Sequence, residues 1–244
     1  VNYNRDVEVF PVLNTIFEKI YGKSPYKSPT DMGVNMAGNC ICDDEACREA
    51  SGQEIIRRYY AALNDLLKGT CSEEPAQKIE LLMNQAGVTI QDRKVVAAAL
   101  NRAQETQSPA AALELPDGRI ITGKTSNLLG ASAALLLNVL KELAGLGHEL
   151  HIISPEAIEP IQKLKVDYLK SRNPRLHTDE VLIALSTSAA ANEDARLALE
   201  QLPKLHGCQA HTSVMLSDVD IKTFQKLGVQ LTCESVYESG HGYY

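Results

Sequence analysis

The spacing of apolar residues changes once along this chain, near Gln107, and that change constrains the fold more than any other feature. Before it, apolar residues recur every three or four positions, as in an amphipathic helix; Val95, Val96 and Ala99 are an example. After it, short apolar runs alternate with helical patterns, which is typical of a sheet covered by helices on both faces. The sequence therefore predicts an α/β chain (α+β overall), with a helical domain over residues 1–106 and a three-layer α/β/α domain over residues 107–244.

The second domain is expected to begin with a β-hairpin, because Asp117-Gly118 is a strong tight-turn signal between two short strands at 111–115 and 119–122. Further strands are expected over three ranges: 150–153, 212–216 and 229–233. The apolar run at 181–185 fits either a strand or a helix. Asn192 and Ser217 are both placed to cap helices that follow them.

Composition excludes several classes of protein. No apolar run approaches the roughly 18 residues of a membrane span. The 24 Lys and Arg against 31 Asp and Glu give a net charge of −7, which is the wrong sign for a surface dedicated to nucleic acid. The chain starts at Val1 without the features of a signal peptide, so we expect a piece of a longer cytoplasmic protein.

The cysteines favour neither disulfides nor a zinc site. Cys40, Cys42 and Cys47 crowd into eight residues, but they lack paired C-x-x-C spacing. A domain of this length can also bury enough apolar surface without disulfides. We therefore expect reduced thiols and no bound metal.

The segment Gly118 to Thr125 fits the phosphate-loop pattern G-x-x-x-x-G-K-[ST], and in that reading Lys124 would reach a terminal phosphate. The competing interpretation is the hairpin itself, because Arg-Ile-Ile-Thr between the two glycines is typical of a strand. The hairpin is favoured. Lys124 and Ser126 remain candidates for binding an anion without a phosphate loop.

The hairpin segment 111–123 and the later Ile153-Ser154-Pro155 resemble the cytidine deaminase superfamily. That resemblance implies a zinc site, with one ligand beside a catalytic Glu on the first helix and two Cys on the next. Here the first helix offers only the small residues 131–134, and the second begins Pro155-Glu156. Since zinc prefers nitrogen and sulfur ligands, we expect a deaminase-like fold without zinc-dependent deaminase activity.

Three longer strings are similar to a bacterial family known as domain of unknown function 1846, or uncharacterised protein family 0371. They occupy residues 28–36, 53–60 and 171–177. The resemblance implies members roughly twice this length, with a glycine-rich, phosphate-loop-like segment upstream of this chain. On that basis the chain is expected to be the C-terminal half, lacking the N-terminal half as its partner. Any nucleotide used by the whole protein would then bind upstream, and no cofactor is expected in this chain.

The best candidate site is a polar link at the end of the basic segment 163–175, which is unusual in an acidic chain. Arg172, Asn173 and Arg175 suit a phosphate or carboxylate, because guanidinium groups pair bidentately with such oxygens. The alternative is that these side chains cap helices or hold the link to the core. His177 and His211 are weaker candidates for acid or base roles.

Thr30, Asp31 and Asn35 are further ligand candidates, raised above simple turn and cap chemistry only by the family resemblance. The leading hypothesis is that the chain is part of an enzyme that acts on a phosphorylated or otherwise anionic small molecule. Whether that enzyme depends on a nucleotide is left open. The alternative is a non-catalytic oligomerisation or regulatory module on a degenerate deaminase-like fold. Under either hypothesis we expect a homo-oligomer, without nucleic acid or membrane partners.

Overall fold

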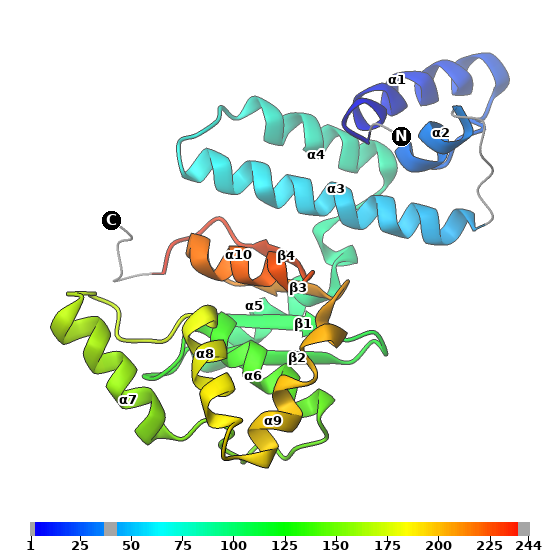
Figure 1. The fold of residues 1–244 in the computed structure, drawn as a ribbon. Coiled ribbons are helices and arrows are strands. Elements are labelled where there is room, and N and C mark those ends of the chain that lie inside the picture. Colours follow the sequence, from blue (N-terminus) through cyan, green and yellow to red (C-terminus); the bar gives the residue numbers. More distant parts are fainter. Residues whose placement is uncertain (1–2, 37–42, 239–244) are drawn as a thin grey trace. The chain divides into compact units, whose positions relative to one another are not determined.

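A computed structural model describes residues 3–36 and 43–238, and the chain forms two compact units (Figure 1). The first unit is residues 1–93 and the second is residues 94–244. The division therefore lies before helix α5 (Lys94–Thr106), which sequence periodicity grouped with the helical part. The reason is packing: Val95 and Ala99 of α5 share a small apolar cluster with Ala112 of the sheet.

The first unit consists of helices. In chain order they are α1 (Tyr3–Tyr21), α2 (Pro29–Met36), α3 (Asp44–Leu67), α4 (Glu74–Ala86) and the short 3-10 helix η1 (Ile90–Asp92). The start of α3 is fixed by Asp43, whose side chain accepts hydrogen bonds from Glu45 N and Ala46 N at 3.1 and 2.9 Å. None of the helices in the described ranges combines the length and hydropathy needed to cross a membrane.

The outer face of α1 carries an exposed apolar stripe. Val12, Ile16 and Ile20 lie at helical spacing, and they are 59%, 43% and 64% exposed. Helical periodicity predicts the helix here correctly, but it would place such a stripe against the core. Phe10 is the side chain of α1 that is buried instead.

The second unit is built on a four-stranded sheet with the order β2-β1-β3-β4. The strands are β1 (Ala110–Glu114), β2 (Ile120–Lys124), β3 (Gln209–Thr212) and β4 (Gln230–Cys233). β1 is antiparallel to both β2 and β3, whereas β3 and β4 are parallel. Gly118 has φ +83° in the turn between β1 and β2, a conformation that favours glycine. The predicted hairpin is confirmed.

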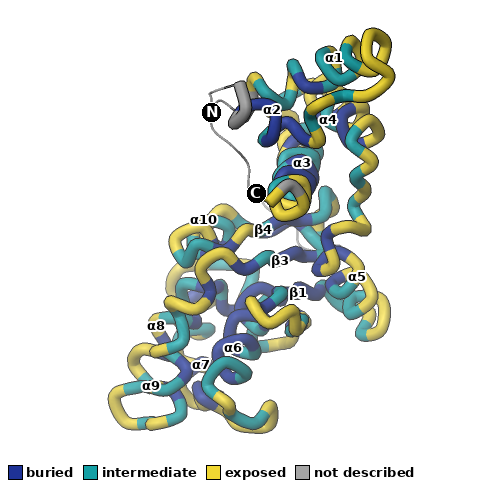
Figure 2. The backbone as a smooth tube through the Cα atoms, turned by 90° about the vertical axis from the view of Figure 1, so that its right-hand side faces the viewer, coloured by how far each residue is buried: buried dark blue, intermediate teal, exposed yellow. Residues whose placement is uncertain are grey.

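Helices cover both faces of this sheet. Ala112 faces α5, while Ala111 and Leu113 face α6 (Ala131–Leu143), as side chains alternate along a strand. Figure 2 shows β1, β3 and α6 as largely buried, with the exposed residues concentrated in the loops and outer helices. This arrangement confirms an α/β fold.

The hairpin excludes the phosphate-loop reading of Gly118 to Thr125. Lys124 pairs with Ala110 in the ladder, so the backbone between the glycines is committed to a strand. At Gly123 a Cβ would lie 2.2 Å from Leu135 N and 2.5 Å from Leu135 Cα. The glycine is therefore required by the close approach of α6 and not by a phosphate.

The remaining helices of the second unit are α7 (Pro155–Lys163), the π-helix η2 (Leu164–Tyr168), α8 (Thr178–Ser188), α9 (Glu193–Leu199), the 3-10 helix η3 (Leu202–Leu205) and α10 (Asp218–Lys226). Of these helices, α8 and α9 pack against α6, α7 packs against α8, and α10 packs against α8 and β4. The ambiguous run 181–185 is helical, within α8. Asn192 and Ser217 cap α9 and α10 through their side chains, as predicted.

Two strand predictions need correction. Residues 150–153 form no strand, because Ile152 and Ile153 enter the core from a loop, and β1 pairs with β3 instead. The strand expected at 212–216 lies earlier, at Gln209–Thr212, and the residues after it lead to the cap of α10. The deaminase-like plan is thus not reproduced strand for strand.

Candidate functional site

The link between η2 and α8 lies along one small pocket. Asn173, Arg175 and His177 line this pocket, and so does Leu176. Between them, Leu176 is buried in the main apolar core. Leu176 also forms a parallel bridge with Leu129, and its carbonyl accepts a hydrogen bond from Gly130 N at 3.3 Å. The link is therefore attached to the loop that leads into α6.

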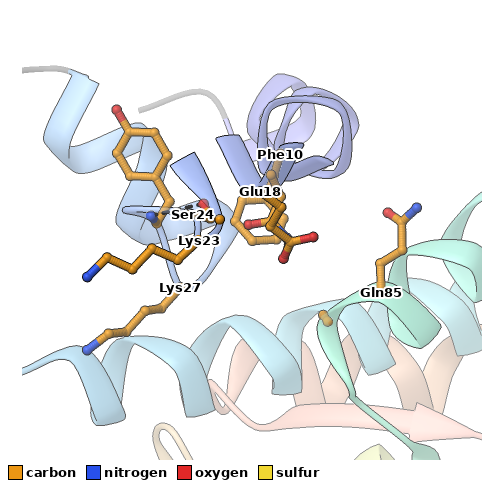
Figure 3. A pocket seen from close by; sticks show the side chains of 10 residues that line it. Phe10, Glu18, Lys23, Ser24, Lys27 and Gln85 are labelled. Carbon is orange, nitrogen blue, oxygen red and sulfur yellow. Dashed lines mark hydrogen bonds between the residues drawn. The ribbon is translucent and has the colours of Figure 1, made fainter. Parts of the chain in front are cut away.

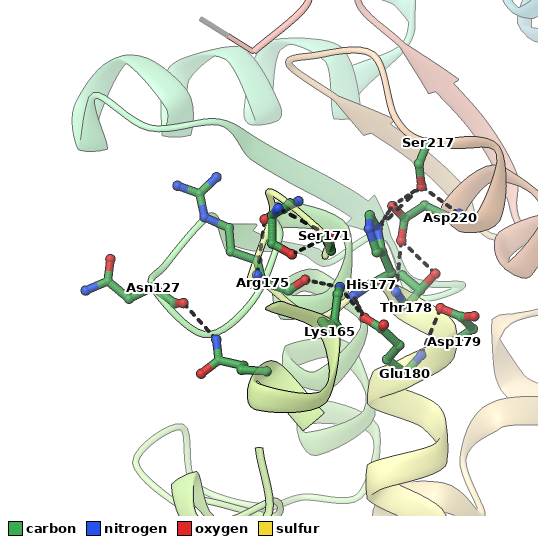
Figure 4. A network of polar contacts seen from close by, with 12 residues as sticks. Asn127, Lys165, Ser171, Arg175, His177, Thr178, Asp179, Glu180, Ser217 and Asp220 are labelled. Atoms are coloured by element: carbon green, nitrogen blue, oxygen red, sulfur yellow. Dashed lines mark hydrogen bonds and ion pairs between the residues drawn. The ribbon is translucent and has the colours of Figure 1, made fainter. Parts of the chain in front are cut away.

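The buried side chain of Lys165 stabilises the same link through two hydrogen bonds. Its Nζ donates to the carbonyl of Arg175 at 2.6 Å and to Glu180 Oε2 at 2.7 Å, and its side chain is only 7% exposed. Glu180 also accepts from His177 N at 2.8 Å, which caps the start of α8 (Figure 4). Lys165 belongs to the basic segment, but its position in a π-helix and its burial assign it to the scaffold.

His177 and Asp220 form the central polar pair of the site (Figure 4). The Nδ1 atom of His177 donates to Asp220 Oδ2 at 2.9 Å. Asp220 Oδ1 accepts from both the backbone N and the hydroxyl of Thr178 at 2.9 Å, and Ser217 Oγ donates to Oδ2 at 2.8 Å. In the described part of the chain Nε2 of His177 has no hydrogen-bond partner, so it is available to a ligand in the pocket.

The interaction between His177 and Asp220 shifts the pKa of each residue. The hydrogen bond that His177 donates to Asp220 raises the pKa of His177, and this outweighs the opposing effect of burial. Burial disfavours the charged form of Asp220, but the hydrogen bond and charge of His177, with those of Thr178 and Ser217, lower its pKa overall. The site therefore favours a protonated imidazole beside a carboxylate.

Arg175 is the second cation of the pocket, and it has an internal partner. Its Nη1 donates to Glu238 Oε1 at 2.7 Å, and Glu238 also lines the pocket. Its backbone N donates to Asn173 Oδ1 at 3.1 Å, so the link is also folded locally. Arg175 and Asn173 therefore also have a structural role, which was the alternative to ligand binding.

The pocket itself is small, with a volume of about 30 Å³, and it lies at the N-terminus of α6. Gly130, Ala131 and Ser132 line it, and no side chain caps that helix end. Ser132 is 2% exposed, and its hydroxyl has no hydrogen-bond partner among the described residues. Thr125 contributes a second hydroxyl. Uncapped N–H groups, the positive end of the helix and hydroxyl donors together suit an anion.

Three predicted ligand residues lie outside this pocket. Lys124 is exposed at the end of β2, and Arg172 is exposed on the link. Ser126 is also exposed, and its Oγ accepts from Leu128 N and Leu129 N at 3.2 and 3.1 Å. Ser126 therefore shapes the turn before α6, which is a structural role.

His211, unlike His177, lies outside the pocket. It is fully buried on β3, where Nδ1 lies 2.8 Å from Thr232 Oγ1 and Nε2 lies 3.2 Å from Glu234 Oε1. Both ring nitrogens are thus engaged within the sheet region, and His211 does not line the pocket. The structure brings only one of the two candidate histidines to the site.

Among the candidates of the first unit, Asp31 takes part in the hydrogen bonds at the start of α2. Ser28 Oγ accepts from Asp31 N at 3.0 Å, and Asp31 Oδ2 accepts from Lys27 N at 2.7 Å, which is a reciprocal cap at the start of α2. Thr30 lies in the first turn of the same helix. The side chain of Asn35 lies outside the described residues.

A wider pocket of about 450 Å³ lies in the first unit (Figure 3). Phe10, which is buried, lines it together with mostly polar side chains. Figure 3 shows Lys23 and Lys27 directed away from Glu18 and Gln85, so the charged groups do not converge on one point. Its walls therefore define no particular ligand.

No group of three or more His, Cys, Asp or Glu side chains suited to a metal occurs within residues 3–36 and 43–238. Cys40 and Cys42 lie outside those ranges, so the structure says nothing of them. Among the described cysteines, Cys47, Cys71 and Cys208 are free thiols.

Sequence reasoning missed four residues of the site: Thr125, Ser132, Asp220 and Glu238. Asp220 was recognisable as a partner of the Ser217 cap, but its contact with His177, 43 residues away, left no local signal. Ser132 was visible only as a small residue at the start of a helix. Sequence spacing cannot predict that residues from segments far apart in the chain meet at one pocket.

Fold and site together define a two-unit α/β protein with a small polar pocket at a helix N-terminus. Family comparison is more specific. The chain belongs to the DUF1846 family: the model described as "Domain of unknown function DUF1846, C-terminal" matches residues 91–243, and the corresponding N-terminal model matches residues 1–87. The expectation of a C-terminal half is corrected accordingly, because sequence matching the N-terminal model is also present.

The chain is similar to bacterial proteins named UPF0371. It is 59% identical to the UPF0371 protein of Corynebacterium urealyticum over 236 residues, covering 97% of this chain and 48% of the relative. The UPF0371 protein of Streptococcus pneumoniae strain JJA is 53% identical over 238 residues, covering 98% and 48%. The chain therefore spans about half the length of these relatives.

Proposed function

We propose that the pocket at the start of α6 binds the anionic group of a small molecule. The observation that carries this proposal is the meeting of an uncapped helix N-terminus with the Ser132 hydroxyl and two side chains that can carry positive charge, Arg175 and His177. The volume suits a small anion or one terminal group, not a whole nucleotide.

His177 gives the site a chemical function beyond binding. Asp220 orients the ring through Nδ1, which directs Nε2 to the pocket as a hydrogen-bond or proton donor. An imidazole with this arrangement is suited to acid–base chemistry on a bound substrate. We therefore propose an enzyme acting on a phosphorylated or otherwise anionic metabolite in the cytoplasm. Any nucleotide dependence belongs to the whole protein.

Titration with inorganic phosphate by calorimetry, at low ionic strength, tests the binding. The limit of about 1.5 kcal/mol per non-hydrogen atom for the smallest ligands puts the dissociation constant no lower than roughly micromolar. Arg175→Ala and Ser132→Ala should each weaken binding about tenfold, which is about 1.4 kcal/mol. Arg172→Ala is the matched control, because that guanidinium is exposed and does not line the pocket. Equal affinity in Arg175→Ala, Arg172→Ala and the unmodified protein would contradict the proposal.

The second candidate function is a non-catalytic oligomerisation or regulatory module related to the deaminase-like fold. Two observations favour it: each pocket cation already has an internal carboxylate partner, and α1 exposes the apolar stripe of Val12, Ile16 and Ile20. An exposed stripe of this kind is typical of a surface that another helix covers, here in a homo-oligomer. Sedimentation of the protein and of Ile16→Glu tests whether this stripe is the interface. A homo-oligomer is expected of either candidate, so phosphate titration separates them: saturable binding supports the anion site, and assembly without any phosphate binding supports the module.

A further inference from the structure

The carboxylate of Glu238 occupies one wall of the anion pocket. We infer that Glu238 is an internal competitor that makes the site select a phosphoryl group over a carboxylate. This inference rests on the proposed function and adds the chemical class of the ligand. It goes beyond the caps and ion pairs already described, because it assigns Glu238 a role in specificity.

The geometry of the pair supports competition. Glu238 Oε1 lies 2.7 Å from Arg175 Nη1, and the two side chains are 16% and 22% exposed. The backbone that carries Glu238 is fixed nearby, because Met215 N donates to the carbonyl of Val236 at 2.8 Å. Glu234 N likewise donates to the carbonyl of Thr212 at 2.9 Å. A carboxylate held in this way has an effective concentration of millimolar or higher at Arg175.

A free carboxylate would gain little by displacing this group. It has the same charge and the same two acceptor oxygens as Glu238, so one ion pair would be exchanged for an equivalent one. The tethered group has the advantage of its effective concentration. A monocarboxylate therefore cannot saturate the site at ordinary concentrations.

A phosphoryl group differs in charge and in number of acceptors. It carries about −1.5 to −2 at neutral pH and three strong acceptor oxygens. Glu238 leaves the Ser132 hydroxyl and His177 Nε2 without a partner in the described structure. A phosphoryl group could use Arg175 and these donors together, and its greater charge would replace that of Glu238. The exchange is favourable only for a ligand with these additional acceptors.

Glu238→Gln tests the inference, because it removes the charge and keeps the size of the side chain. The probes are inorganic phosphate and acetate, titrated into the full chain at constant ionic strength. The unmodified protein should bind phosphate, with no saturable binding of acetate. In Glu238→Gln, phosphate should bind about tenfold more tightly and acetate binding should become measurable. Glu159→Gln makes the same charge change at an exposed position on α7 and should leave both affinities unchanged.

The outcomes separate this inference from the proposed function. If Glu238→Gln binds phosphate as the unmodified protein does, while Arg175→Ala loses it, the competitor role is wrong and the anion site stands. If no variant binds phosphate, both are wrong. Thermal unfolding confirms that each variant is folded. Should Glu238→Gln not fold, Glu238→Asp retracts the carboxylate by one methylene, and unchanged phosphate affinity there overturns the inference equally.

Discussion

The Nδ1 atom of His177 lies 2.9 Å from Oδ2 of Asp220, although 43 residues separate them in the chain. The pair joins the first residues of two helices, because His177 precedes α8 and Asp220 lies in the first turn of α10. It also controls the acidity of the group that faces the pocket. The consequences for stability and binding can be measured separately.

Stability should depend on pH through His177. Its pKa is raised in the folded protein, so its contribution is fully present below the unfolded value of about 6.5 and is lost as pH rises through the folded pKa. Urea unfolding of the protein and of His177→Gln, from pH 5.5 to 9, should show a difference that shrinks above about pH 6.5. The slope cannot exceed about 1.4 kcal/mol per pH unit for one proton. A difference that stays constant over this range would contradict the prediction.

Asp220→Ala should destabilise the protein by about 3–5 kcal/mol, as expected when one partner of a buried ion pair is removed. The substitution leaves His177, the Thr178 N–H and the Ser217 hydroxyl without their acceptor. Equilibrium unfolding in urea measures the change. Asp167→Ala, at an exposed carboxylate, should alter stability by no more than about 0.5 kcal/mol. Similar losses in the two variants would show that the network is not the cause.

Lys165→Met should weaken phosphate binding as well as stability. The substitution removes the donor to the Arg175 carbonyl and to Glu180, so the link that positions Arg175 and His177 loosens. We expect a loss of about 1–3 kcal/mol in stability, from the acceptors left unpaired. Lys163→Met is the matched control, because that lysine is exposed. Lys165 acts by positioning, so Lys165→Arg should restore part of the phosphate affinity; no recovery at all would argue against this role.

Gly123→Ala should be among the most damaging substitutions in the second unit. Its Cβ would lie 2.2 Å from Leu135 N, and a helix backbone cannot move aside as a flexible side chain does. Overpacking of this kind costs about 1–3 kcal/mol or more. Gly52→Ala offers a comparison, because its Cβ meets only a Val88 methyl at 3.4 Å and alanine favours the helix. Thermal unfolding should show a large decrease in Tm for Gly123→Ala and no decrease in Tm for Gly52→Ala.

Local signals predicted much of the fold. The Asp117-Gly118 turn, the Asn192 cap and the Ser217 cap each depend on neighbouring residues alone, and all three are present. The strand predicted at residues 150–153 was wrong because two consecutive buried isoleucines look the same in a strand and in a buried loop. The sequence does not show whether a neighbouring strand is free to pair with them. The apolar stripe on α1 shows a related limit: periodicity identifies a helix and its apolar face, but not what covers that face.

The site was predictable in part. The Arg-and-Asn link was found from composition, and Asn173, Arg175 and His177 do share a pocket. Arg172 was not separable from Arg175 by residue type; in the structure Arg175 lines the pocket, whereas Arg172 is exposed outside it. Glu238 and Ser132 could not be assigned, because their relevance depends on the pairing of segments far apart in the chain.

One strand pairing has a consequence for how the pocket forms. The hydroxyl of Ser213 accepts from Ala110 N, 103 residues earlier, where β3 joins β1. Closing so long a loop is entropically costly, so this pairing should form late in folding, after the local hairpin of β1 and β2. Asp220 and Glu238 follow β3 in the chain, whereas Ser132 and Arg175 precede it. We therefore expect the pocket to be assembled late in folding, so that an anion bound there slows unfolding more than it speeds folding.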